Sequence, residues 1–130
     1  MSQREVITAG DAPAAAGAYS HAMATESLVF TAGQIGIDPA TGELVAGDAA
    51  AQAQRVLENL DAVLRAAGAG LDTVLKATIY LADMADFNAV NEVYSARMPQ
   101  PYPARTTIAV KAIPRGALVE IECVATRNVG

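Results

Sequence analysis

The sequence predicts an α+β fold in which two helices cover one face of a sheet of about six strands. Apolar residues recur at helical spacing in two segments, and the remaining apolar runs alternate as strands do, in the order β-β-β-α-β-α-β-β. Each expected strand has one apolar and one mixed face, which is typical of a sheet covered on one side. The 130 residues suit a single domain over 1–130 with one core.

The first part of the chain contains three expected strands. Residues 4–7 can form a short first strand, and the Ala-, Pro- and Gly-rich residues 11–18 form a loop. Residues 19–25 and 28–35 are rich in β-forming side chains and only two residues separate them, which predicts a hairpin. Asp-Pro and Thr-Gly pairs in residues 38–45 then predict turns.

Two helices are expected next in the chain. Asp48 can cap the first helix and Gly68 can end it. Its apolar stripe consists of Val56, Leu57, Leu60, Val63, Leu64 and Ala67. Asp83 and Asp86 frame the start of the second helix. The stripe of the second helix consists of Phe87, Val90, Tyr94 and Met98.

A strand over residues 73–82 lies between the helices, and two more strands end the chain. The strand over residues 73–82 is expected to place Leu75, Ala77, Ile79 and Leu81 on one face. Prolines at 99, 101 and 103 exclude a helix there and predict an extended loop. In the last two strands, one face is expected to carry Arg105, Thr107, Ala109, Leu118, Glu120, Glu122 and Val124. We expect the helices to cover the opposite face.

This uncovered face would hold a guanidinium and two carboxylates among apolar residues such as Val124 and Tyr80. It is too apolar for open water, so we expect it to be buried against another copy of the chain. Symmetric homo-oligomers are the usual solution.

Composition argues against several classes of function. A net charge of −5 with pI near 4.7 is opposite to the basic stripe of nucleic-acid-binding proteins. A single cysteine excludes an internal disulfide. No apolar run approaches the roughly 20 residues of a membrane span, and the first residues do not resemble a signal peptide. We therefore expect a soluble cytoplasmic protein without membrane or nucleic-acid partners.

Three charged residues near the end of the chain are candidates for chemistry. Arg105 can grip a carboxylate in a two-pronged contact, or it can form a structural ion pair with Glu120 or Glu122. A glutamate beside a water and an electrophile can act as a general base. The alternative is a pair of solvated charges, which is the commoner explanation for Glu122.

Four further residues have both a functional and a structural interpretation. Asn91 can bond a ligand or cap a loop, and Tyr19 can meet a polar ligand or pack in the core. His21 is the only histidine and Cys123 the only cysteine, so no metal-ligand spacing exists and no metal site is expected. Both are expected to be structural.

Six segments of the chain together form a recognisable pattern: GAYSHA (17–22), FTAGQIGIDPATGEL (30–44), QAQRVLENLDAVLRAAG (52–68), DFNAVNEVY (86–94), PARTTIAV (103–110) and VEIECVA (119–125). In this order they resemble the RidA/YjgF family of reactive intermediate deaminases. The resemblance implies a chorismate-mutase-like fold, with a six-stranded mixed sheet backed by two helices. It also implies a homotrimer with sites between subunits, which hydrolyses 2-imino acids such as 2-iminopropanoate and 2-iminobutanoate without a cofactor.

The resemblance also implies roles for individual residues. Arg105 would bind the substrate carboxylate, and Glu120 would position or activate the attacking water. The other implied substrate contacts are Tyr19, Gly33, Asn91 and Thr107.

The chain departs from the family pattern at several positions. Ala32 stands where many members have serine, and Thr107 stands where many have cysteine. Gly17-Ala18-Tyr19 replaces Gly-Pro-Tyr, and the loop over residues 97–103 is shorter. These changes affect the expected substrate range.

Two other functions fit the same fold. A non-enzymatic trimeric sensor of small acids, or a chaperone-like protein, would keep Arg105 but would not need Glu120. A ribonuclease is the third possibility. The net charge of −5 and the lack of a basic patch or stacking aromatics argue against it.

Overall fold

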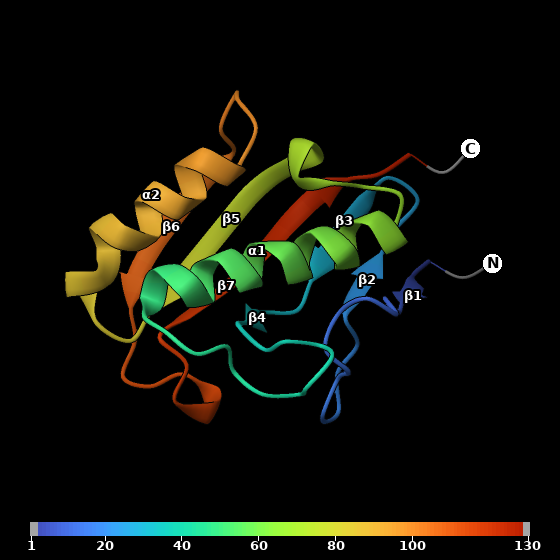
Figure 1. The fold of residues 1–130 in the computed structure, drawn as a ribbon. Coiled ribbons are helices and arrows are strands. Elements are labelled where there is room, and N and C mark those ends of the chain that lie inside the picture. The colour runs from blue at the N-terminus through green and yellow to red at the C-terminus, as the bar shows by residue number, and fades with distance from the viewer. Residues whose placement is uncertain (1–2, 129–130) are drawn as a thin grey trace.

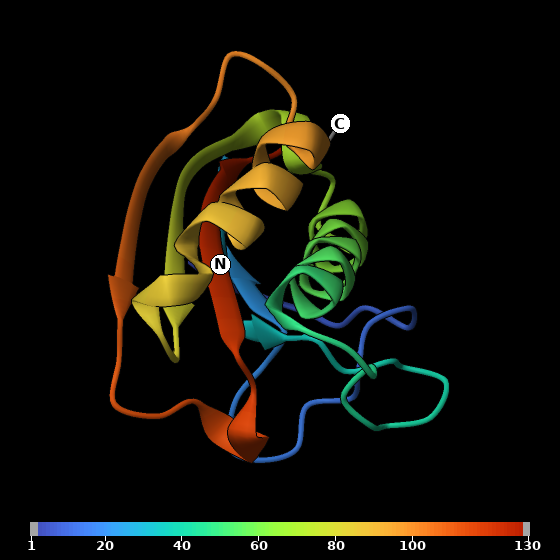
Figure 2. The same ribbon diagram turned by 60° about the vertical axis from the view of Figure 1, so that its left-hand side comes forward.

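The computed structural model describes residues 3–128, in which one sheet is covered by two helices on the same face (Figure 1). The strands are β1 (Glu5–Ile7), β2 (Ala22–Ala24), β3 (Leu28–Thr31), β4 (Gln34–Ile35), β5 (Val74–Leu81), β6 (Ala104–Ala109) and β7 (Val119–Thr126). The helices are α1 (Ala49–Ala66) and α2 (Phe87–Arg97). In Figure 2 both helices lie on one side of the long strands β5, β6 and β7. The predicted fold class is confirmed.

The sheet is mixed, with the strand order β1-β2-β3-β7-β5-β6. Among the strands of residues 3–128, only β5 and β6 run parallel; the other pairs are antiparallel. The segment expected as one strand over 28–35 divides at Ala32 and Gly33 into β3 and the short β4, and both parts pair with β7. The sheet therefore has one more strand than the predicted six.

Helix α1 begins and ends where the sequence predicts. An Asp48 side-chain oxygen accepts a hydrogen bond from the amide of Ala51 at 3.0 Å, which caps the first turn. Gly68 follows the last turn with a φ of +79°, a left-handed conformation that suits glycine. The predicted apolar stripe is buried against the sheet, with Val56, Leu60 and Leu64 at most 1% exposed.

Helix α2 also matches its prediction. The Asp83 carboxylate caps the short 3-10 turn before it by accepting from the amide of Ala85 at 2.9 Å. Val90, Tyr94 and Met98 are buried on the face toward the sheet. The helix packs beside α1 and lies over β5 and β6 (Figures 1 and 2).

One residue of β5 departs from its predicted face. The pairing of β5 with β7 shifts register between Val74 and Lys76, which leaves Leu75 in a bulge. Leu75 is consequently 50% exposed, while Val74 takes the buried position. Beyond the bulge the prediction is confirmed, because Ala77, Ile79 and Leu81 lie in the core.

The predicted faces of β6 are wrong. Arg105 and Thr107 pair in register with Ala77 and Ile79, which are buried on the helix side. Neighbouring residues of paired strands point to the same face, so Arg105 and Thr107 lie under α2 rather than on the uncovered face. The alternation along β6 assigned its apolar residues to the helix side. This was wrong because β6 is an edge strand, and its apolar Ile108 is 43% exposed on the uncovered face.

The predicted faces of β7 are confirmed. Val119, Ile121 and Ala125 are buried toward the helices, whereas Glu120 and Glu122 are partly exposed on the uncovered face. This face also carries apolar side chains, which include Phe30, Val124 and Ile108. No helix within residues 3–128 is long and apolar enough to cross a membrane.

Candidate functional site

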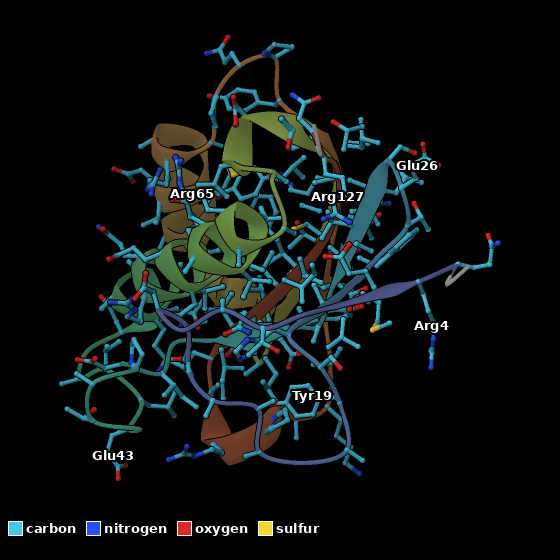
Figure 3. All side chains as sticks on the ribbon, turned by 90° about the vertical axis from the view of Figure 1, so that its right-hand side faces the viewer. Arg4, Tyr19, Glu26, Glu43, Arg65 and Arg127 are labelled. Atoms are coloured by element: carbon cyan, nitrogen blue, oxygen red, sulfur yellow. The ribbon has the colours of Figure 1, made fainter. Side chains whose placement is uncertain are left out.

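A pocket of about 690 Å³ opens beside the start of β7. Glu120 is the only acidic residue in its lining, and Tyr19 and Arg115 lie there with it. The other lining residues are Pro13, Ala14, Ala16, Ala32, Gly33, Gln34, Ile35, Ile37, Pro39, Gly42 and Pro114. Figure 3 shows Tyr19 on its loop beside the 3-10 turn over Pro114–Gly116. The walls are mostly apolar, so the few polar groups would orient a ligand.

The carboxylate of Glu120 lies against the backbone of Gly33. A Cβ at position 33 would come within 2.8 Å of the Glu120 Cδ, so only glycine leaves room for this placement. Burial, and secondarily the charge of Glu122, raises the pKa of Glu120 above its ordinary value. A carboxylate with this property can take up and release a proton closer to neutral pH than an exposed one.

Tyr19 reaches the pocket from a loop, not from a strand. The strand expected over 19–25 begins only at Ala22, and the Tyr19 side chain is 52% exposed. Its hydroxyl accepts a hydrogen bond from the amide of Ala16 at 3.3 Å. His21, two residues after Tyr19, is buried and fixes the backbone of this loop.

His21 is structural, as predicted. Its Nδ1 accepts from the amide of Ala9 at 2.9 Å, so Nε2 carries the proton and donates to the carbonyl of Pro13 at 2.7 Å. Both ring nitrogens are therefore engaged. The two bonds tie the loop that carries Tyr19 to the end of β1.

Arg115 belongs to the pocket although the sequence reasoning did not select it. Its backbone is left-handed, with φ of 63° and ψ of 18°, an uncommon conformation for a residue other than glycine. The guanidinium donates to the carbonyl of Gly42 at 3.1 Å and lies 3.6 Å from the carboxylate of Glu43. The sequence Pro-Arg-Gly at 114–116 indicates a turn, and this turn was the feature of the sequence that could have selected Arg115.

Arg105 lies in a second polar site, beneath α2. Its Nη1 donates to Oδ1 of Asn91 at 2.6 Å. The guanidinium also lies 5.0 Å from the ring centre of Tyr94 and 5.7 Å from that of Phe87. Asn91 thus holds the arginine and does not cap a loop. Within residues 3–128 Arg105 forms no ion pair with either glutamate of β7, so the structural alternative for this arginine is wrong.

Two hydroxyl groups beside Arg105 are buried without a hydrogen-bond partner in the described part of the chain. They are Oγ1 of Thr107 and the hydroxyl of Tyr94. Burial raises the pKa of Tyr94, which keeps this hydroxyl protonated. An unpartnered buried hydroxyl is unfavourable, so Thr107 offers a position for a polar atom of a ligand or of another chain.

The two polar sites lie on opposite faces of the sheet. Arg105 pairs with Ala77, which pairs with Cys123, three residues from Glu120 along β7. With β5 between β6 and β7, Arg105 and Glu120 are roughly 10 Å apart across the strands and roughly 10 Å apart along them. One small molecule cannot contact both side chains of the same chain. The predicted residues therefore form two groups, with Tyr19, Gly33 and Glu120 in one and Asn91, Arg105 and Thr107 in the other.

Nucleophilic and metal-binding groups are scarce. Burial raises the pKa of the Cys123 thiol to about 11, so this residue is a core thiol as predicted. Among residues 3–128, no cluster of three or more His, Cys, Asp or Glu side chains could hold a metal ion.

Comparison with known proteins identifies close relatives. The profile of the family described as "Endoribonuclease L-PSP" matches residues 9–127. The chain is 46% identical over 124 residues to the Arabidopsis thaliana protein "Reactive Intermediate Deaminase A, chloroplastic", and the match covers 95% of this chain and 66% of that protein. It is 43% identical over 125 residues to the human 2-iminobutanoate/2-iminopropanoate deaminase, with 96% and 91% covered.

A solved structure supports the same relationship. RidA from the Antarctic bacterium Psychrobacter sp. PAMC 21119 superposes with a TM-score of 0.91 at 43% identity. The match covers 94% of this chain and 98% of that one.

Proposed function

The chain belongs to the endoribonuclease L-PSP family, which includes proteins named RidA, and from this premise we propose that it hydrolyses 2-imino acids to 2-oxo acids and ammonia. The expected substrates are small, such as 2-iminopropanoate and 2-iminobutanoate. The names of the human and Arabidopsis relatives support this chemistry. We also propose a cytoplasmic location, although the Arabidopsis relative is named as chloroplastic.

The observation that carries the proposal is the placement of Glu120. Its carboxylate lies against Gly33 in a largely apolar pocket, and its pKa is raised by burial and by Glu122. Such a group can accept a proton from water and return it within one catalytic cycle. Imine hydrolysis needs this exchange of protons.

The reaction proceeds in two steps that Glu120 can serve. In the first, the water oxygen bonds to the imine carbon, the Glu120 carboxylate takes a proton from that water, and the nitrogen receives the proton. In the second, the new hydroxyl of the carbinolamine gives up its proton through Glu120 to the nitrogen. The C–N bond then breaks with its electron pair on nitrogen, and ammonia leaves as the C=O bond forms.

Arg105 would bind the substrate carboxylate. Asn91 and the rings of Tyr94 and Phe87 hold the guanidinium in place, so little side-chain freedom is lost when a ligand binds. A planar guanidinium matches a carboxylate with two hydrogen bonds. The unpartnered hydroxyl of Thr107 would take a further polar contact.

A complete site would need two copies of the chain. Arg105 and Glu120 lie on opposite faces of one sheet, so we propose that Arg105 of one subunit meets Glu120 of its neighbour. The apolar residues of the uncovered face, such as Phe30 and Ile108, are available for the contact between subunits. We propose a homotrimer, as the resemblance of the sequence implies.

A trapping assay tests the function. Threonine dehydratase generates 2-iminobutanoate in place, and semicarbazide competes for it. Wild-type protein should suppress formation of the semicarbazone, whereas Arg105→Ala should lose about 100-fold in kcat/KM, or roughly 2.7 kcal/mol of transition-state stabilisation. Arg65→Ala is the matched control, because this arginine is 71% exposed on the outer side of α1. An inactive wild-type protein would overturn the proposal.

The same assay separates an enzyme from a sensor of small acids. Glu120→Gln should abolish turnover while binding of 2-oxobutanoate, the product, is retained in calorimetry. A wild-type protein that binds 2-oxobutanoate without any turnover would favour the sensor. The family name also refers to ribonucleases, but a net charge of −5 does not favour binding to RNA.

A further inference from the structure

Three polar side chains form a cluster on the uncovered face of the sheet, at the edge of the Glu120 pocket. Tyr80 on β5 is directly opposite Glu120 on β7. Glu122 lies two residues further along β7 and points to the same face. The Tyr80 hydroxyl donates a hydrogen bond diagonally to Oε1 of Glu122, at 3.1 Å.

The two carboxylates have different surroundings. Glu122 accepts the Tyr80 hydrogen bond, which fixes its carboxylate on the face that it shares with Glu120. Within residues 3–128, no hydrogen bond is found to the carboxylate of Glu120, which lies among apolar pocket walls. Burial and a nearby negative charge both favour the protonated form of a carboxyl group, and both act on Glu120.

We propose that Glu122, held by the hydroxyl of Tyr80, is a positioning residue that makes Glu120 the member of the pair that exchanges a proton with the substrate. Glu122 acts through its charge and touches neither water nor imine. The inference rests on the proposed imine hydrolysis and identifies what adapts Glu120 to it. Tyr80 contributes by fixing Glu122, not by contacting the substrate.

The pKa values agree with this geometry. After burial, the charge of Glu122 is the next cause that raises the pKa of Glu120. Burial and the bond to Glu122 also raise the pKa of Tyr80, so its hydroxyl remains a donor throughout the neutral range.

Other charged groups near Glu120 are engaged elsewhere. On the 3-10 turn, Arg115 is paired with Glu43 and with the carbonyl of Gly42. On β5, Lys76 donates to the hydroxyl of Thr106 and so points toward β6. The remaining neighbours contribute no charge at neutral pH. They are Tyr19 from its loop and Gly33, Gln34 and Ile35 from the segment that contains β4.

The experiment is the pH profile of kcat/KM for imine hydrolysis. Activity of the wild type should rise with pH as Glu120 ionises. Glu122→Gln removes a negative charge, so the acidic limb should move down by roughly 0.5–1 pH unit. Tyr80→Phe should move the limb in the same direction by less, because Glu122 then lacks the hydrogen bond that holds its charge beside Glu120. The double variant should match Glu122→Gln alone, since Tyr80 acts through Glu122.

Glu92→Gln, on the exposed side of α2, is the matched control and should leave the profile unchanged. Thermal unfolding of each variant identifies any loss of fold. A lower rate at every pH with an unmoved acidic limb would show a merely structural role for Glu122 and overturn the inference. A limb that moves to higher pH would also overturn it.

A second readout does not depend on activity. The carboxyl carbon of Glu120 can be followed by NMR in protein labelled at glutamate, with its signal assigned by loss in Glu120→Gln. Its titration should move down in Glu122→Gln even if imines prove not to be the substrate, which separates this inference from the proposed function. An unmoved titration overturns the inference. A moved titration with an unmoved activity limb also overturns it, because Glu120 would then not control the rate.

Discussion

Glu120 depends on the absence of a side chain at Gly33. Because its carboxylate occupies the space of a Cβ at this position, Gly33→Ala must displace it. The obstructed group is the end of a flexible side chain, so the fold should survive while the carboxylate leaves the pocket.

We therefore expect kcat/KM of Gly33→Ala to fall by roughly 10- to 100-fold with an unchanged circular dichroism spectrum. Gly10→Ala is the control, since a Cβ at Gly10 meets nothing within 4 Å. Full activity in Gly33→Ala would mean that the position of Glu120 is not required.

The raised pKa of Glu120 also affects stability. The folded chain favours the protonated carboxyl, so this contribution to stability is complete below the ordinary pKa of 4.5 and is lost as pH rises through the raised value. At pH 7 the ionised group therefore destabilises the fold.

Glu120→Gln should raise the melting temperature at pH 7 by roughly 1–3 °C. The difference should disappear at pH 4 and below, where the wild type is itself protonated. With the expected rise, activity and stability oppose each other at this residue. A melting temperature that falls equally at both pH values would contradict the assigned shift.

Among the elements, α1 positions the walls of the pocket through buried amides. Asn59 is fully buried, and its Nδ2 donates to the carbonyls of Ile35 and Ile37 at 3.2 and 2.9 Å. Gln52 accepts from the amide of Leu118, two residues before Glu120, at 2.8 Å. Ile35 and Ile37 line the pocket, so the helix supports the site without touching it.

Removing the Asn59 amide takes a donor from the carbonyls of Ile35 and Ile37, although Ile35 keeps the bond from the amide of Ile37. Asn59→Ala should lower the free energy of unfolding by about 2–3 kcal/mol in urea titration. It should also reduce kcat, because the pocket wall loses its support. Gln54→Ala, exposed on the same helix, should change stability by less than about 0.5 kcal/mol. Similar losses in both variants would show that the effect does not come from the hydrogen bonds of Asn59.

For the whole molecule, the sheet separates the two halves of the site. Arg105 under α2 and Glu120 on the open face can complete a site only between chains, if the proposed assembly is correct. Such a site makes inactive variants complementary, because each variant retains the half that the other lacks.

Arg105→Ala and Glu120→Ala subunits, mixed during co-expression, should recover about one quarter of wild-type activity, the chance that a random interface combines both intact halves. Each variant alone should have at most about 1% of wild-type activity, as expected for a loss of about 100-fold. A mixture that stays inactive would contradict a shared site. Light scattering on the wild type measures the number of subunits directly.

The sequence by itself determined the class of fold, the presence of both helices, the ends of α1 at Asp48 and Gly68, and the faces of β7. These features depend on local periodicity and capping, which neighbouring residues establish. Its resemblance to a family also selected Arg105, Asn91 and Glu120 before their surroundings were visible.

Only the tertiary structure decided how strands pair. The bulge at Leu75, the break between β3 and β4, and the face of Arg105 follow from hydrogen bonds between distant segments. Alternation along one strand shows which residues share a face, but not which face meets the helices when an edge strand is apolar on its open side. The bond between Tyr80 and Glu122 spans 42 residues, so local sequence carried no signal of it. For the same reason, the separation of Arg105 from Glu120 became visible only in the folded chain.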